Sequence, residues 1–205
     1  MDTFFKLPSY LFHPLWMPIL GVSGVYYFFP ISFDQINIIS DLVVIFFSTI
    51  VIPLLFLLLL KKTKIIESLH LKKVKERKLP VLFFTCIAAF IINFIFPPES
   101  NQLFFYFFSG VFFSGILASV FTISNFKISL HMIGLSGIAA FVYMILRGFH
   151  SNTIITLALA ILLLSWLASS RIYMKAHTTK EILIGVVVGA MPQIYFFSDL
   201  ATWLN

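Results

Sequence analysis

The chain has 205 residues, of which 60% are hydrophobic and 11% are charged, and its mean hydropathy is +1.02. A soluble domain of this size does not carry so much apolar surface, so the composition indicates one all-α polytopic membrane bundle over residues 1–205. The formal charge of +6 would suit nucleic acid. The basic residues, however, lie in short loops between apolar segments, which favours anionic headgroups or phosphates as partners and no nucleic acid. A single cysteine excludes a disulfide framework and a zinc cluster.

Seven apolar stretches are candidates to cross the membrane, because about 20 helical residues span a hydrocarbon core of about 30 Å. They run over residues 11–29, 38–60, 80–97, 102–124, 130–147, 153–170 and 182–198. The first is the weakest, since Pro14 and Pro18 interrupt it early, and it is interpreted as a kinked span or a re-entrant segment. The sequence therefore predicts six to seven transmembrane helices in a lipid bilayer.

Small residues on the fourth and fifth stretches predict close contacts between helices. They are Ser109, Gly110, Ser114, Gly115, Gly134 and Gly137. Three histidines near the ends of apolar stretches or in loops have the character of residues at the membrane–water interface. They are His13, which lies close to Trp16, His70 and His150.

Three polar segments are separated from one another by two spans each. They are the basic loop 61–78, the turn 124–131 and the segment 170–181. An even number of crossings returns the chain to the same face, so all three segments are predicted to lie together on one side of the membrane. This conclusion does not depend on whether the first apolar stretch spans.

The segment 170–181 has the spacing of a catalytic group. Charged side chains at membrane depth cost roughly 2.5–3.5 kcal/mol each, so they are usually functional or interfacial. Glu181 follows His177 by four residues, so if the helix that begins here includes His177, Glu181 lies one turn along on the same face. The carboxylate can then accept the Nδ1–H of the imidazole and leave Nε2 free as a nucleophile. Arg171, six residues earlier, can offer its planar donors to a phosphate.

The other two polar segments complete a pattern that suits phosphoryl transfer. His131 supplies a second histidine, and lysines and arginines surround both. Cations can stabilise the phosphoryl oxygens while one histidine attacks and the other protonates the leaving oxygen. A metal site is disfavoured, because only one nearby carboxylate could join the histidines and the basic ring repels a cation.

The order and spacing of these residues resemble the type 2 phosphatidic acid phosphatase superfamily. The third family motif, Ser-Arg-x5-His-x3-Asp, is matched from Ser170 to Glu181 with Glu for Asp. The second, Pro-Ser-Gly-His, is matched by Ile128-Ser129-Leu130-His131, without the proline and glycine. The first, Lys-x6-Arg-Pro, keeps Lys72 and Pro80 but has Leu79 in the arginine position. The opening Phe12-His13-Pro14-Leu15 is similar to that of a branch of small, Bacteroidetes-like members.

The resemblance covers about residues 60–195 and implies a role for each matched position. His177 would form a phosphohistidine, Glu181 would orient it, and His131 would be the general acid. The phosphate would be bound by Lys72, Ser129 and Arg171, with Arg77 or Lys127 in place of the missing arginine. Each charge-assisted hydrogen bond to such an anion is worth on the order of 1.5–3 kcal/mol. No metal or other cofactor is implied.

The function expected from this pattern is hydrolysis of a phosphorylated membrane lipid: an isoprenoid diphosphate, phosphatidate or phosphatidylglycerophosphate. A lipid phosphotransferase and a catalytically inactive lipid-binding protein are the alternatives. The resemblance implies the bacterial inner membrane with the site facing the periplasm. Thirteen of the 14 lysines and arginines, however, lie on the side of the motifs, and the positive-inside rule places such a face in the cytoplasm. The orientation and the oligomeric state stay open.

Overall fold

The computed structural model describes residues 2–28, 35–148 and 152–198, and the regular elements within these ranges are all helical. His150 and the end of the first apolar stretch lie outside them. The elements are α1 (Asp2–Leu11), η1 (Pro14–Trp16), α2 (Met17–Phe28), α3 (Gln35–Phe46), η3 (Phe47–Val51), α4 (Ile52–Lys62), α5 (Val74–Phe90), η4 (Ile91–Ile95), α6 (Gln102–Ile123), α7 (Leu130–Gly148), α8 (Ile154–Tyr173) and α9 (Thr179–Phe197).

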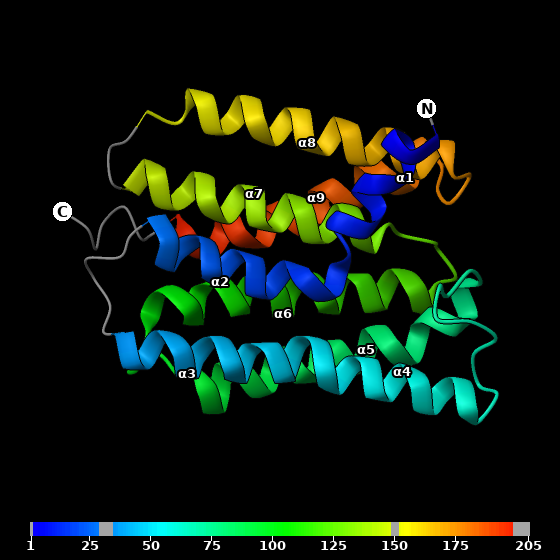
Figure 1. Cartoon of the computed structure of the whole chain (residues 1–205), viewed down its shortest axis with the longest axis horizontal. Helices are drawn as coiled ribbons and strands as arrows, with labels where there is room; N and C mark the ends of the chain where they lie inside the picture. Colours follow the sequence, from blue (N-terminus) through cyan, green and yellow to red (C-terminus); the bar gives the residue numbers. More distant parts are fainter. Residues whose placement is uncertain (1, 29–34, 149–151, 199–205) are drawn as a thin grey trace.

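Six helices in the described ranges are long and apolar enough to cross a membrane. They are Ile38–Lys62, Val74–Ile95, Gln102–Ile123, Leu130–Gly148, Ile154–Tyr173 and Thr179–Phe197. The first of them joins α3 and α4 through the π-helical turn η3, which lies just ahead of Pro53. The helices run lengthwise beside one another (Figure 1). The protein is therefore a polytopic helical membrane bundle, as the composition predicts.

The first apolar stretch does not form one long helix. It is divided among the end of α1, the short 3-10 turn η1 and the 12-residue helix α2. The break falls at His13 and Pro14, because Pro14 has no N–H for a continuous helix. Together α1, η1 and α2 lead the chain from the right-hand end of the bundle in Figure 1 to its left-hand end. This stretch is broken and is not one of the six long helices.

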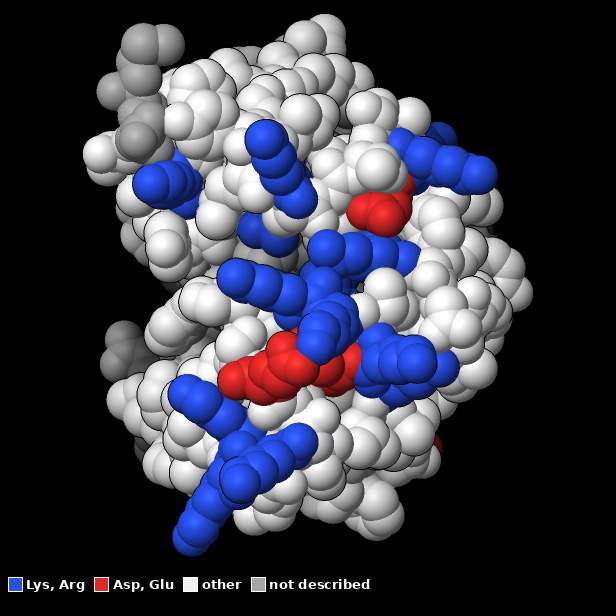
Figure 2. All heavy atoms as spheres, turned by 90° about the vertical axis from the view of Figure 1, so that its right-hand side faces the viewer, with Lys and Arg blue, Asp and Glu red and all other residues white. Residues whose placement is uncertain are grey.

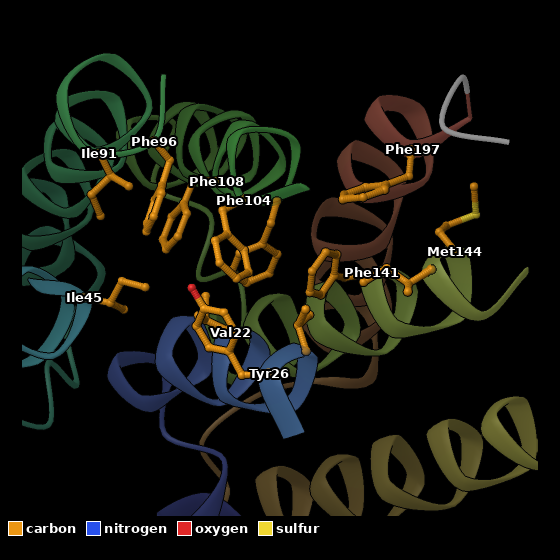
Figure 3. Packing of buried hydrophobic residues seen from close by; sticks show 13 residues of the cluster. Val22, Tyr26, Ile45, Ile91, Phe96, Phe104, Phe108, Phe141, Met144 and Phe197 are labelled. Carbon is orange, nitrogen blue, oxygen red and sulfur yellow. The ribbon is translucent and has the colours of Figure 1, made fainter. Parts of the chain in front are cut away.

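Aromatic side chains fill the part of the bundle around α2, α6, α7 and α9. Phe104, Phe107, Phe108, Phe141 and Phe197 are all at most 1% exposed and belong to one cluster. Figure 3 shows how their rings interdigitate with side chains from neighbouring helices. Close packing of this kind holds helices together in lipid, where the hydrophobic effect contributes little to helix association.

The predicted small residues do lie at helix contacts. A Cβ atom added at Gly110 would approach Gln193 of α9 within 2.4 Å, and one at Gly115 would approach Thr85 of α5 within 2.5 Å. At Gly134 the nearest atom would be Met17 Cγ, at 2.6 Å. For Gly110, Gly115 and Gly134 the interpretation as packing positions is confirmed, because at these three no larger side chain would fit without movement of a neighbour.

The three polar segments meet at one end of the bundle, as the span count predicts. This is the right-hand end in Figure 1, and Figure 2 shows its lysines and arginines spread over that face. The helices α4, α6 and α8 each end here, followed by a residue with a left-handed backbone. These residues are Lys64, Asn125 and Lys175, with φ of 60°, 60° and 51°. The reversals direct the following residues back over the end of the bundle.

Candidate active site

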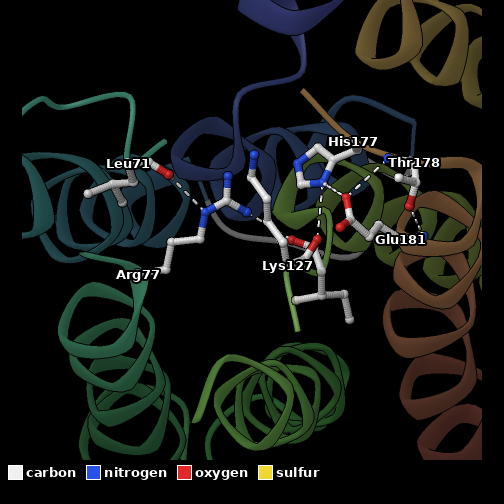
Figure 4. Close-up of polar contacts among 7 residues, drawn as sticks. Leu71, Arg77, Lys127, His177, Thr178 and Glu181 are labelled. Carbon is white, nitrogen blue, oxygen red and sulfur yellow. Dashed lines mark hydrogen bonds and ion pairs between the residues drawn. The ribbon is translucent and has the colours of Figure 1, made fainter. Parts of the chain in front are cut away.

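His177 lies in the turn between α8 and α9, where its ring is fixed by two acceptors. Its Nδ1 is 2.9 Å from Oε2 of Glu181 and 3.1 Å from the carbonyl oxygen of Lys127. Since a carbonyl oxygen only accepts, Nδ1 carries the proton and Nε2 of the neutral ring has a free lone pair. Figure 4 shows Nδ1 turned to these acceptors and the other nitrogen turned toward Lys127 and Arg77. The hydrogen bond predicted from the four-residue spacing is present.

The environment of His177 keeps its imidazole uncharged. The side chain is 1% exposed. Burial lowers the pKa of His177 to about 4, and the charges of Arg77 and Arg171 also lower it, whereas Glu181 raises it. A buried imidazole beside two guanidinium groups costs more to protonate than one in water. His177 is therefore a neutral base or nucleophile near pH 7.

The first motif segment contributes Arg77 to the site. It is buried, and its Nε and Nη1 donate to the carbonyl oxygens of Leu71 (2.9 Å) and Ile128 (3.0 Å). Leu79, in the position where the family has arginine, is 46% exposed on the outer surface of the bundle. Two residues along an α-helix turn the side chain by about 200°, so positions 77 and 79 face nearly opposite ways. In this chain, Arg77 is therefore the arginine of the first motif segment that lies at the site.

Three other predicted cations line the same cavity as His177: Lys72, Lys127 and Arg171. Arg171 is buried, and its Nη1 donates to the Ser9 hydroxyl at 3.1 Å, while its buried Nε has no partner among the described residues. Burial, followed by the charge of Arg77, lowers the pKa of Lys127. Free or loosely held donors of this kind are suited to an anion that arrives with the substrate.

Ser129, unlike the predicted cations, does not line the cavity. It is fully buried, and its Oγ has no hydrogen-bond partner among the described residues. A Cβ at Gly185 of α9 would lie 2.9 Å from its carbonyl oxygen and 3.4 Å from its Cβ, so Ser129 packs directly against α9. Its contact with a phosphate stays a prediction.

His131 lies at the start of α7 and also lines the cavity. Its Nε2 is 3.1 Å from the carbonyl oxygen of Ser9 in α1. The carbonyl requires a proton on Nε2, which leaves Nδ1 as the nitrogen able to exchange a proton with a ligand. The Ser9 hydroxyl is also 2.7 Å from that of Ser170. One residue of α1 thus contacts both His131 and Arg171.

The sequence interpretation missed Ser9, His13 and His70. His13 and His70 were interpreted as interfacial, whereas both line the cavity with His131 and His177. The ring of His13 meets the ring of His131 edge to face, with 5.4 Å between centroids. The signal for His13 was the Phe-His-Pro-Leu opening shared with the small family members; no pattern pointed to Ser9.

His177 lines two hollows. A pocket of about 400 Å³ lies at the loops and is lined by Lys127, Ile172, Lys175, Ala176, His177, Thr178 and Glu181. A cavity of about 1000 Å³ extends into the bundle and is lined by side chains of α1, α2, α4, α5, α6, α7 and α9, with Gln193 among them. The 12 residues from Glu181 to Gln193 correspond to roughly 18 Å along α9. The cavity therefore joins the cationic site to the apolar middle of the bundle.

Within the described ranges, no group of three or more His, Cys, Asp or Glu residues is placed to hold a metal ion. The charged groups around His177 are Arg77, Arg171, Lys127 and Glu181. Such an excess of positive charge is complementary to a phosphate.

Comparison of the chain with protein-family models, with curated proteins and with solved structures found no match. The resemblance to the lipid phosphatases therefore depends on the three sequence motifs alone.

Proposed function

We propose that this protein is an integral-membrane lipid phosphatase that works through a phosphohistidine at His177. The observation that carries the proposal is the fixed, neutral imidazole of His177 at the cationic end of a long cavity. Its nucleophilic nitrogen is turned toward the cations that would neutralise a phosphate (Figure 4).

In the proposed first step, Nε2 of His177 attacks phosphorus and the bond from phosphorus to the lipid oxygen breaks. His131, which takes up a proton on Nδ1 for this step, gives that proton to the departing oxygen. Arg77, Lys127 and Arg171 stabilise the negative charge of the transferring group. In the second step, His131 takes a proton from water, which attacks phosphorus, and inorganic phosphate leaves with His177 restored.

The long cavity supports a lipid over a soluble ester as the substrate. Most of its walls are apolar residues of the membrane-spanning helices, and it reaches roughly 18 Å beyond the site along α9. This depth suits a hydrocarbon chain. The 400 Å³ pocket on the loop side of His177 offers a separate route for water and phosphate.

The test is phosphate release by the purified protein in lipid nanodiscs, with chelator and without added metal. The lipids are farnesyl diphosphate, phosphatidate and phosphatidylglycerophosphate, and a short soluble phosphate ester is the comparison. We expect release from at least one lipid and loss of at least 100-fold in His177→Ala. Lys180→Ala, which changes an exposed residue of the same turn, should keep wild-type activity.

Full activity of His177→Ala would contradict the mechanism. Transfer of labelled phosphate to a second lipid, with little release to water, would identify a phosphotransferase. Binding of these lipids without turnover would identify an inactive lipid-binding protein.

A further inference from the structure

His13 is the group on the cavity wall that the proposed mechanism leaves without a role. It is the N-cap of η1, and its side chain lies beside His131 with ring centroids 5.4 Å apart. It reaches this place because the chain breaks at Pro14 and folds α1 over the basic end of the bundle (Figure 1). The break thus adds a third histidine to the cavity that holds His131 and His177.

The protonation of His13 follows from its contacts. Its Nδ1 accepts a hydrogen bond from the backbone N–H of Leu15, at 3.4 Å. Burial, and then the charges of Arg171 and His70, lower the pKa of His13. The ring is therefore neutral near pH 7, with its one proton on Nε2. Among the described residues, the hydrogen bond of His13 runs through Nδ1, so the Nε2–H remains available to a ligand.

We propose that His13 is a further catalytic residue, whose Nε2–H donates a hydrogen bond to the lipid oxygen that leaves phosphorus. This inference rests on the proposed function. His131 supplies the proton to that oxygen, and His13 keeps its own proton throughout. The edge-to-face arrangement brings both imidazoles to one part of the cavity wall. As a neutral donor, His13 stabilises the charge that develops on the leaving oxygen without adding to the repulsion among the nearby cations.

A purely structural role is the competing explanation, because His13 caps η1. Two variants separate the roles. His13→Ser keeps a good N-cap residue but removes the ring, whereas His13→Phe keeps a ring against His131 but removes the cap. Both variants lose the Nε2–H, so the proposal requires kcat to be lowered in both. If one does not fold, the other still decides.

The experiment compares a monophosphate and a diphosphate of the same lipid in nanodiscs. The two pairs are farnesyl phosphate with farnesyl diphosphate, and phosphatidate with diacylglycerol diphosphate. A monophosphate releases an alcohol, which needs strong stabilisation as it leaves, whereas a diphosphate releases a far more stable phosphate monoester. We expect each variant to lower kcat about 100-fold on the monophosphates, and by less than about 10-fold on the diphosphates, with an unchanged Tm for His13→Ser.

Wild-type kcat in His13→Ser would overturn the proposal and leave capping as the role of His13. An equal loss on monophosphates and diphosphates would also overturn it, because His13 would then not contact the leaving oxygen. If the wild-type protein hydrolysed the diphosphates but not the monophosphates, the proposal would also be overturned, because a phosphate monoester leaves without such a donor. In each of these cases the proposed function survives if His177→Ala is inactive. Phosphate release neither from the four lipids nor from phosphatidylglycerophosphate would instead end the proposed function itself.

Discussion

One carboxylate oxygen of Glu181 serves both the helix and the site. Its Oε2 accepts from Nδ1 of His177 at 2.9 Å and from the backbone N–H of Thr178 at 3.1 Å. The hydroxyl of Thr178 in turn accepts from the backbone N–H of Glu181, which completes a capping box. The start of α9 and the orientation of the imidazole are therefore fixed by the same side chain.

We predict that Glu181→Asp keeps substantial activity and that Glu181→Gln loses much more, by roughly 100-fold or more. Aspartate preserves the negative charge and can reach the imidazole after a small shift of α9. Glutamine can still accept a hydrogen bond, but it cannot stabilise the cationic imidazole charge during turnover. The measurement is kcat in nanodiscs for the three proteins. Equal activity in all three would show that Glu181 does not orient the nucleophile.

The protonation of His177 makes a second prediction. Because burial and the two arginines hold its pKa at about 4, its ring stays unprotonated as the pH falls from 7 to 5. On the acid side, the contribution of His177 to kcat/KM should therefore be lost only near pH 4, not near the ordinary histidine value of 6.5. A pH profile of kcat/KM in nanodiscs tests this for the free enzyme. Loss of the His177 contribution at pH 6.5 would mean that its ring is solvated in the working protein.

At the scale of elements, the site depends on how closely α7 and α9 approach. The two helices carry His131 and Glu181, and they meet through glycines. A Cβ at Gly189 would lie 2.2 Å from both the carbonyl oxygen of Ile133 and the hydroxyl oxygen of Ser136. Because the first of these is a backbone atom, a side chain could be accommodated only if the helices separated.

We predict that Gly189→Ala destabilises the protein by about 1–3 kcal/mol through overpacking and lowers activity by displacing α9. The matched control is Gly24→Ala in α2, where an added Cβ has no atom within 4 Å. There alanine should be neutral or stabilising by up to about 1 kcal/mol, because it favours helix. Thermal unfolding in detergent compares the two. Similar stability of both variants would argue against close α7–α9 packing.

At the scale of the whole molecule, the bundle has one strongly basic end. Five of its cations line the hollows around His177: Lys72, Arg77, Lys127, Arg171 and Lys175. Eight others lie at the same end: Lys6, Lys61, Lys62, Lys64, Lys73, Lys75, Lys78 and Lys180. Arg147, near the end of α7, belongs to the opposite end. The charge bias therefore remains large after the site cations are set aside.

We predict from this bias that the basic end faces the cytoplasm. In a Cys86→Ala background, a cysteine at Ser68 of the basic loop should be protected from an impermeant thiol reagent in intact cells. A cysteine at Ser100, in the turn before α6, should react. Labelling of Ser68→Cys with protection of Ser100→Cys would establish the opposite orientation, which the family resemblance implies.

The sequence by itself determined the class of the protein and the meeting of its three polar segments at one end of the bundle. Apolar length dictates how many helices can span, and the number of spans between two loops dictates whether they share a face. The pairing of His177 with Glu181 was also predictable, since the two residues are only four positions apart. In the structure His177 lies just ahead of the N-cap Thr178, so the pair forms across the start of α9 and not along a helix face. These features depend on neighbours along the chain.

Only the tertiary structure decided which residues complete the site. Ser9 and His13 precede His131 by more than 100 residues, and the break at Pro14 brings them to it. Arg77 takes the place of the family's arginine at position 79 because the rotation of α5 turns Arg77 into the cavity and Leu79 to the outside of the bundle. The spacing of a motif does not convey this rotation. Ser129 matches its motif yet packs on α9. Contacts between distant segments follow from how helices pack, and the order of residues along the chain does not encode them locally.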